Sequence, residues 1–115
     1  MIYAVDFDGC LCRNAYPDIG EPNIRLIRDL MRLRQKGNHV ILWTCREGER
    51  LDAAVKWCAN IGLVFDAVND NLPMMVEAYG CNSRKVFADC YLDDKATRVS
   101  FRLSSRSGRG KRKVE

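Results

Sequence analysis

The stretch IYAVDFDG (residues 2–9) joins a short apolar run to two acids and a glycine. Its residue types predict a buried β-strand over Ile2–Phe7 that ends in a turn. Three later runs have the same character and predict strands at Val40–Trp43, Leu63–Val68 and Val86–Leu92. Because these runs are almost continuously apolar, we expect a sheet that is covered on both faces.

The segments between these strands carry apolar residues at helical spacing. Residues 22–36 open with a proline, which suits a first helical turn, and are followed by the stop signal Gly37. Residues 48–61 repeat the pattern before Gly62, and a short helix is expected over Met74–Ala78. Strands that alternate with helices form βαβ units, which predicts an α/β fold with a parallel sheet.

The charge is divided unevenly along the 115 residues, whose number suits a single domain. Residues 1–94 carry 11 basic and 14 acidic side chains, whereas residues 95–115 carry 8 basic side chains and 1 acid. We therefore expect a folded domain over residues 1–103 and a basic, disordered tail over residues 104–115. Two interpretations of the tail stay open: a solvated extension, or a segment that contacts nucleic-acid phosphates.

The N-terminus lacks a signal-peptide pattern, and no apolar run reaches the length of a membrane span. We therefore expect a cytoplasmic protein without a membrane partner. Disulfides are rare in that compartment, so the six cysteines are interpreted as free thiols. Cys45 and Cys90 lie in apolar runs and are expected in the core.

Polar and charged residues gather where the predicted strands end. They are Asp6 and Asp8 after the first strand, Thr44 and Arg46 after the second, and Asp93 and Asp94 after the fourth, with Lys85 just before the fourth. The carboxyl ends of parallel strands meet at one edge of the sheet, where ligands bind. We therefore expect these residues to converge, although they are far apart in sequence.

Several carboxylates at one edge repel one another, and a divalent cation relieves that repulsion. Ligands that are all oxygen favour Mg²⁺, which also binds substrate phosphate oxygens. An aspartate can then attack phosphorus and form an aspartyl-phosphate, while a second carboxyl group protonates the leaving oxygen and later activates water. A threonine hydroxyl and a lysine ammonium can hold the phosphoryl oxygens as charge develops.

Four motifs in order, DFDG, ILWT, SRK and YLDD, resemble those of the haloacid-dehalogenase superfamily. The resemblance covers residues 2–95. It implies a single Rossmann-like domain with a parallel sheet of about four strands in the order 3-2-1-4, flanked by helices. The windows where that family carries a cap domain, residues 10–20 and 69–84, are too short for one, so an open site without a cap is expected.

The resemblance also implies roles for the four acids. Asp6 would be the nucleophile and a metal ligand. Asp8 would be the general acid and base, with its main-chain carbonyl on the Mg²⁺ ion. Asp93 would complete the metal site, and Asp94 would support it directly or through water.

The resemblance further implies residues that bind phosphate. Thr44 would bind the phosphoryl group, and Lys85 would neutralise it, with Arg84 as the alternative cation. Arg46 has two interpretations, a local salt bridge with Glu47 or a contact with the substrate.

These residues together predict a magnesium-dependent phosphomonoesterase that acts on a phosphorylated small molecule or a nucleotide. Three alternatives stay open: a phosphate- or metal-binding domain without turnover, a polynucleotide-end phosphatase that uses the basic tail, and a receiver-like module phosphorylated near Asp70. A second copy of the chain could cover the open site as a homo-oligomer.

Overall fold

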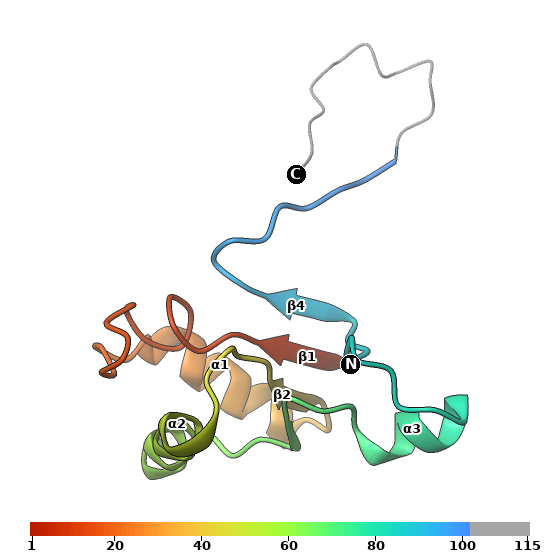
Figure 1. The fold of residues 1–115 in the computed structure, drawn as a ribbon, viewed down its shortest axis with the longest axis horizontal. Coiled ribbons are helices and arrows are strands. Elements are labelled where there is room, and N and C mark those ends of the chain that lie inside the picture. The colour runs from red at the N-terminus through yellow and green to blue at the C-terminus, as the bar shows by residue number, and fades with distance from the viewer. Residues whose placement is uncertain (102–115) are drawn as a thin grey trace.

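A parallel four-stranded sheet forms the centre of the fold (Figure 1). The structure is a computed structural model and describes residues 1–101, so the basic tail and the last two residues of the predicted domain lie outside it. The strands are β1 (Ile2–Val5), β2 (His39–Leu42), β3 (Ala67–Val68) and β4 (Cys90–Leu92). Their order is β3-β2-β1-β4 with all pairs parallel, which confirms the predicted α/β class and strand order.

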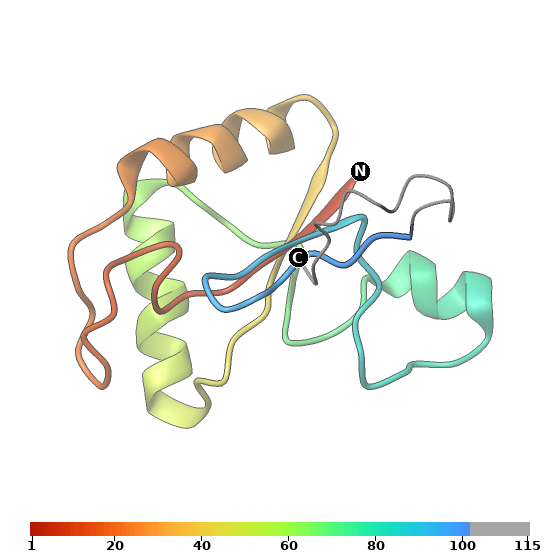
Figure 2. The ribbon, with the colours of Figure 1, turned by 90° about the horizontal axis from the view of Figure 1, so that it is seen from above.

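Three helices flank this sheet. Helices α1 (Ile24–Gln35) and α2 (Gly48–Ile61) cover one face, whereas the short helix α3 (Pro73–Tyr79) lies on the other (Figure 2). All three follow the predicted spans closely. No helix within residues 1–101 has the length and apolar character to cross a lipid bilayer.

The fourth strand is shorter than predicted and begins at Cys90 rather than at Val86. At Val86 and Phe87 the backbone is bonded to side chains instead of a neighbouring strand, although the Asp89 N–H already donates to the Ile2 carbonyl of β1 at 2.8 Å. The Phe87 N–H donates to the Asn71 side-chain oxygen at 2.7 Å, and the Val86 carbonyl accepts from the Tyr91 hydroxyl at 2.6 Å. Backbone groups that are satisfied in this way need no strand partner.

Side chains alternate between the two faces of the sheet and build two cores. Val5, Val40 and Leu42 belong to the larger core beneath α1 and α2. Ile2, Ala4 and Ile41 belong to the smaller core on the α3 side. The alternation along β1 therefore directs the next residue on the Ile2 and Ala4 side, Asp6, toward the α3 face at the carboxyl edge.

The prediction that Cys45 and Cys90 are core residues is wrong for Cys45, which is exposed, and Cys90 is only half-buried. Strand β2 ends at Leu42, so Cys45 lies in the connection to α2 beyond the covered part of the sheet. Cys12 and Cys58 are the cysteines that the larger core buries.

Asp66 ties α1 to the sheet. Its carboxylate accepts hydrogen bonds from Arg34 at 2.8 and 3.1 Å and from the Val40 amide at 2.8 Å. Burial alone would raise the pKa of Asp66, but the Arg34 and Val40 hydrogen bonds outweigh it and lower the pKa below 3.8. The stabilisation from this carboxylate is therefore present above pH 3.8 and is lost as the pH falls through the lower folded-state value.

We expect Asp66→Asn to lower the free energy of unfolding at pH 7 by about 1–2 kcal/mol, because the bidentate pair with Arg34 is lost. Urea unfolding at pH 7 and at strongly acidic pH measures the effect, and the difference from wild type should shrink in acid. Asp29→Asn is the matched control, because the Asp29–Arg32 pair on the same helix is exposed and contributes little. An equal decrease in the free energy of unfolding in both variants would contradict the assigned role of Asp66.

Candidate functional site

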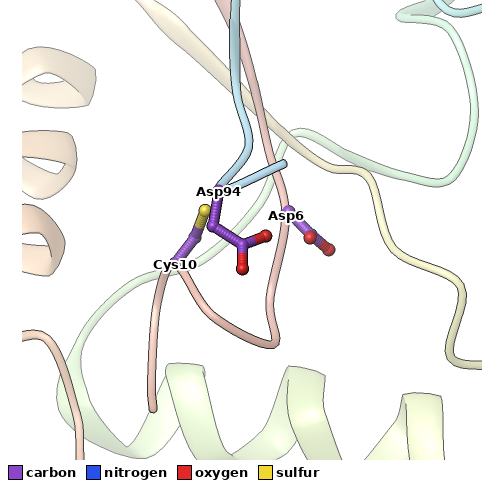
Figure 3. Close-up of side chains that lie close together, drawn as sticks. All are labelled: Asp6, Cys10 and Asp94. Atoms are coloured by element: carbon purple, nitrogen blue, oxygen red, sulfur yellow. The ribbon is translucent and has the colours of Figure 1, made fainter. Parts of the chain in front are cut away.

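Acids from β1 and β4 meet at the carboxyl edge of the sheet. The two strands pair in parallel with Val5 opposite Leu92, and the Asp6 N–H continues the ladder by donating to the Leu92 carbonyl at 2.9 Å. Ligand atoms of Asp6, Cys10 and Asp94 consequently lie within 4.8 Å of one another. Figure 3 shows the Asp94 carboxylate pointing toward Asp6.

The turn after β1 leaves room for the Asp94 carboxylate only because residue 9 is glycine. Gly9 has a φ of +88°, a left-handed conformation that side chains rarely adopt. A Cβ atom at this position would also lie 2.7 Å from the Asp94 Cγ atom. Both the turn and the approach of Asp94 to Asp6 therefore require a glycine here.

Crowding of negative charge is strongest at Asp6. Burial raises the pKa of Asp6, and repulsion from Asp93, Asp94 and Asp8 raises it further. The Phe7 amide, which donates to the Asp6 carboxylate at 2.8 Å, partly offsets these effects. A group of carboxylates that repel one another is stabilised by a cation placed among them.

Cys10 lies in the same cluster but stays a thiol at neutral pH. Burial, followed by the charge of Asp6, raises the pKa of Cys10 to about 11. Its Sγ atom lies 3.6 Å from the Leu92 carbonyl, to which the thiol donates. The charged donors of this cluster are therefore carboxylate oxygens, which suit a hard cation such as Mg²⁺.

A hollow of about 410 Å³, which we call the acid hollow, opens beside this cluster. It is lined by Asp6, Trp43, Thr44, Cys45, Asn69 and Asp93. The Thr44 amide donates to the Asn69 side chain at 2.8 Å, and the Thr44 hydroxyl accepts from the Arg46 amide at 3.2 Å. These bonds fix Thr44 in the same hollow as Asp6 and Asp93, as the strand-end pattern predicted.

Asp8 is bound by Arg46, an arrangement that the sequence interpretation missed. Arg46 donates from Nε and from a terminal nitrogen to the two carboxylate oxygens of Asp8, each at 2.8 Å. The expected salt bridge with Glu47 is wrong for this structure, because Arg46 pairs with Asp8 instead. A contact between Arg46 and the substrate stays a prediction, and the Arg46 side chain is only 2% exposed. The Asp8 side chain therefore stays outside the Asp6–Asp94 cluster, and coordination through its main-chain carbonyl stays a prediction.

Arg46 also fastens the loop that follows the first turn. Its terminal nitrogens donate to the carbonyls of Pro17 at 3.3 Å and Asp18 at 2.8 Å. The guanidinium carbon lies 4.9 Å from the centre of the Phe7 ring and 5.1 Å from that of Tyr16. The position of Arg46, two residues after Thr44 at the same edge, is the sequence signal that could have identified Asp8 as its partner.

The structure does not bring Lys85 to Asp6. Lys85 lines a different hollow on the α3 side, and its ammonium lies 5.3 Å from the centre of the Tyr91 ring. Within residues 1–101 it forms no ion pair with a carboxylate, and Arg84 is likewise exposed. Asp70, the acid of the receiver-like alternative, accepts hydrogen bonds from Asn71 and Asn82 and holds a loop together.

Comparison with known proteins found a match among solved structures. No protein-family model and no curated protein matches the chain. A solved structure of a conserved protein from Bacteroides thetaiotaomicron is 43% identical, with a TM-score of 0.75. The match covers 84% of this chain and 77% of that protein.

Proposed function

The chain belongs to the family of the conserved Bacteroides thetaiotaomicron protein, and from its own site we propose that it is a magnesium-dependent phosphomonoesterase with Asp6 as the nucleophile. The observation that carries this proposal is the position of Asp6. It lies at the end of β1, in one hollow with Thr44 and Asp93 and in contact range of Asp94. The resemblance to the haloacid-dehalogenase superfamily supports the same assignment.

The residues present fit a hard divalent cation. The Asp6 pKa, raised by burial and by three neighbouring acids, indicates a site with an excess of negative charge. Asp6, Asp93 and Asp94 would hold the ion, together with the Asp8 main-chain carbonyl. Bound Mg²⁺ would neutralise these acids and the oxygens of a phosphate group.

In the proposed reaction, an Asp6 carboxylate oxygen attacks phosphorus and the bond from phosphorus to the alcohol oxygen breaks. Asp8 gives a proton to that leaving oxygen. Asp8 then takes a proton from water as the water oxygen attacks the aspartyl-phosphate, which releases inorganic phosphate and restores Asp6. The Thr44 hydroxyl donates a hydrogen bond to a phosphoryl oxygen. For the proton transfers, one of the two hydrogen bonds between Arg46 and the Asp8 carboxylate must break.

Acid-quenched turnover tests the proposal directly. The full-length chain is mixed with an aryl phosphate and Mg²⁺, quenched within milliseconds and digested for mass spectrometry. We expect phosphate on the peptide that contains Asp6 and loss of turnover when Mg²⁺ is chelated. Turnover that survives chelation, or a phosphate group on a different residue, would refute the assignment.

A phosphate-binding domain without turnover is the second candidate, and the Asp8–Arg46 pair favours it. Both Asp8 oxygens accept hydrogen bonds from Arg46, so the structure gives this carboxylate a structural partner in place of a substrate. Calorimetry with inorganic phosphate and Mg²⁺, alongside the turnover assay, separates the two functions. Binding without any hydrolysis would favour this second candidate.

We expect Gly9→Ala to weaken Mg²⁺ binding by about tenfold or more, because the added Cβ displaces the Asp94 carboxylate. Calorimetric titration with Mg²⁺ measures the change. Gly37→Ala is the matched control, because Gly37 has a similar φ of +96° but open space around its Cβ position. If both variants bind Mg²⁺ as wild type does, Asp94 is not a ligand.

A further inference from the structure

A further hollow, of about 430 Å³, opens at the same carboxyl edge of the sheet as the acid hollow, and we call it the Tyr16 hollow. It lies between the turn after β1, the loop over residues 13–18 and the connection from β2 to α2. Its lining residues are Asp8, Asn14, Tyr16, Cys45 and Arg46. Cys45 lines the acid hollow as well, so the two hollows adjoin and one small molecule can extend from one into the other.

The position of Asp8 relates the Tyr16 hollow to the proposed reaction. Asp8 lines this hollow, whereas Asp6, Thr44 and Asp93 line the acid hollow. A general acid must lie within hydrogen-bond reach of the oxygen that it protonates. The phosphoryl group that Asp6 attacks therefore belongs in the acid hollow, and the alcohol that leaves with a proton from Asp8 belongs in the Tyr16 hollow.

Hydrogen bonds hold Tyr16 at the wall of this hollow. The Tyr16 amide donates to the Asn14 side-chain oxygen at 3.3 Å. Arg46 fastens the next two residues through the Pro17 and Asp18 carbonyls, and its guanidinium carbon lies 5.1 Å from the centre of the Tyr16 ring. Tyr16 is nevertheless 56% exposed, so its ring is both preorganised and accessible.

The lining of the Tyr16 hollow favours a planar ring over a second anionic group. Asp8 and Arg46 are the acid and the base among its five lining residues, and two hydrogen bonds join them to each other. This lining therefore offers no unpaired cation to a carboxylate or a second phosphate. It does offer the face of an exposed tyrosine, on which planar aromatic rings stack.

We propose that the Tyr16 hollow binds a planar aromatic ring of the leaving alcohol, stacked on Tyr16, while the phosphoryl group lies in the acid hollow. This inference rests on the proposed phosphomonoesterase function. It narrows the substrates to phosphate monoesters whose ring lies close to the ester oxygen, because the two hollows meet at one shared side chain, Cys45. Arylmethyl phosphates are esters of this class.

Benzyl phosphate and cyclohexylmethyl phosphate form a matched pair of probes, because both are esters of a primary alcohol with rings of the same size, and only the benzyl ring is planar. We expect the full-length wild type with Mg²⁺ to show a kcat/KM about tenfold higher for benzyl phosphate. Tyr16→Ala should abolish most of this preference, and Tyr16→Phe, which keeps the ring, should retain it. Tyr79→Ala is the control, because Tyr79 is an exposed tyrosine of α3 that does not line the Tyr16 hollow. Equal kcat/KM of the wild type for the two esters, or an unchanged preference in Tyr16→Ala, would overturn the ring site and leave hydrolysis standing.

Protection of Cys45 from alkylation separates failure of this inference from failure of the proposed function, because it needs no turnover. Cys45 is exposed and lines both hollows, and the exposed Cys81 on the α3 side is the control within the same chain. In the Asp6→Asn protein with Mg²⁺, benzyl phosphate should slow iodoacetamide labelling of Cys45 at concentrations about tenfold below those of cyclohexylmethyl phosphate, and adding Tyr16→Ala should abolish the difference. If wild type hydrolyses neither ester but this preference is present, hydrolysis fails and the ring site stands. Equal protection by the two esters, or protection by neither, overturns the ring site.

Discussion

Replacing Asp6 by asparagine is expected to lower kcat for phosphate-ester hydrolysis by at least about a thousandfold, because the amide cannot attack phosphorus. The same substitution should raise the free energy of unfolding at pH 7. Burial and the neighbouring acids raise the pKa of Asp6, so the folded state holds its ionised form at a cost. The asparagine oxygen can still accept the hydrogen bond from the Phe7 amide, and the uncharged side chain no longer repels the neighbouring acids.

Steady-state kinetics and urea unfolding at pH 7 measure both effects on the same samples. Asp52→Asn is the control, because Asp52 is an exposed acid on α2 away from the strand ends and should change neither quantity. Activity within tenfold of wild type would rule out Asp6 as the nucleophile. A loss of stability in the Asp6 variant would contradict the crowding of charge at the edge of β1 and β4.

The part of the site that the sequence predicted is the part that strand geometry determines. Asp6 and Asp93 directly follow β1 and β4, Thr44 comes two residues after the end of β2, and parallel pairing brings strand ends to one edge. The alternation of side chains along each strand then determines on which face of the sheet each of these residues lies. The convergence of these residues follows from the strands alone and does not depend on the paths of the loops.

The residues that were misplaced depend on loops, whose paths the sequence pattern does not determine. Arg46 had an acid beside it in sequence, Glu47, and one across the site, Asp8. The carbonyls of Pro17 and Asp18 favour Asp8 as the partner, because they accept the remaining Arg46 hydrogen bonds. The order of motifs predicts Lys85 beside the phosphate, whereas the Asn71 hydrogen bonds hold the segment that carries Lys85 on the α3 side.

Arg46→Ala is expected to lower the free energy of unfolding by about 3–4 kcal/mol, because it leaves the Asp8 carboxylate without its cation and two loop carbonyls without donors. Arg46→Lys retains the charge but cannot reproduce the bidentate contact, and we expect a loss of about 2 kcal/mol. Urea unfolding at pH 7 measures both. Arg50→Ala is the control, since Arg50 is exposed and only approaches the Tyr16 ring at 5.7 Å.

A double-mutant cycle identifies the source of the loss. If the unpaired Asp8 carboxylate dominates, Asp8→Asn in the Arg46→Ala background should recover part of the stability. If the loop carbonyls of Pro17 and Asp18 dominate, the second substitution should recover nothing. A loss below about 1 kcal/mol for Arg46→Ala would contradict both sources. Arg46 would then be free to leave Asp8, which is the movement that proton transfer by Asp8 requires.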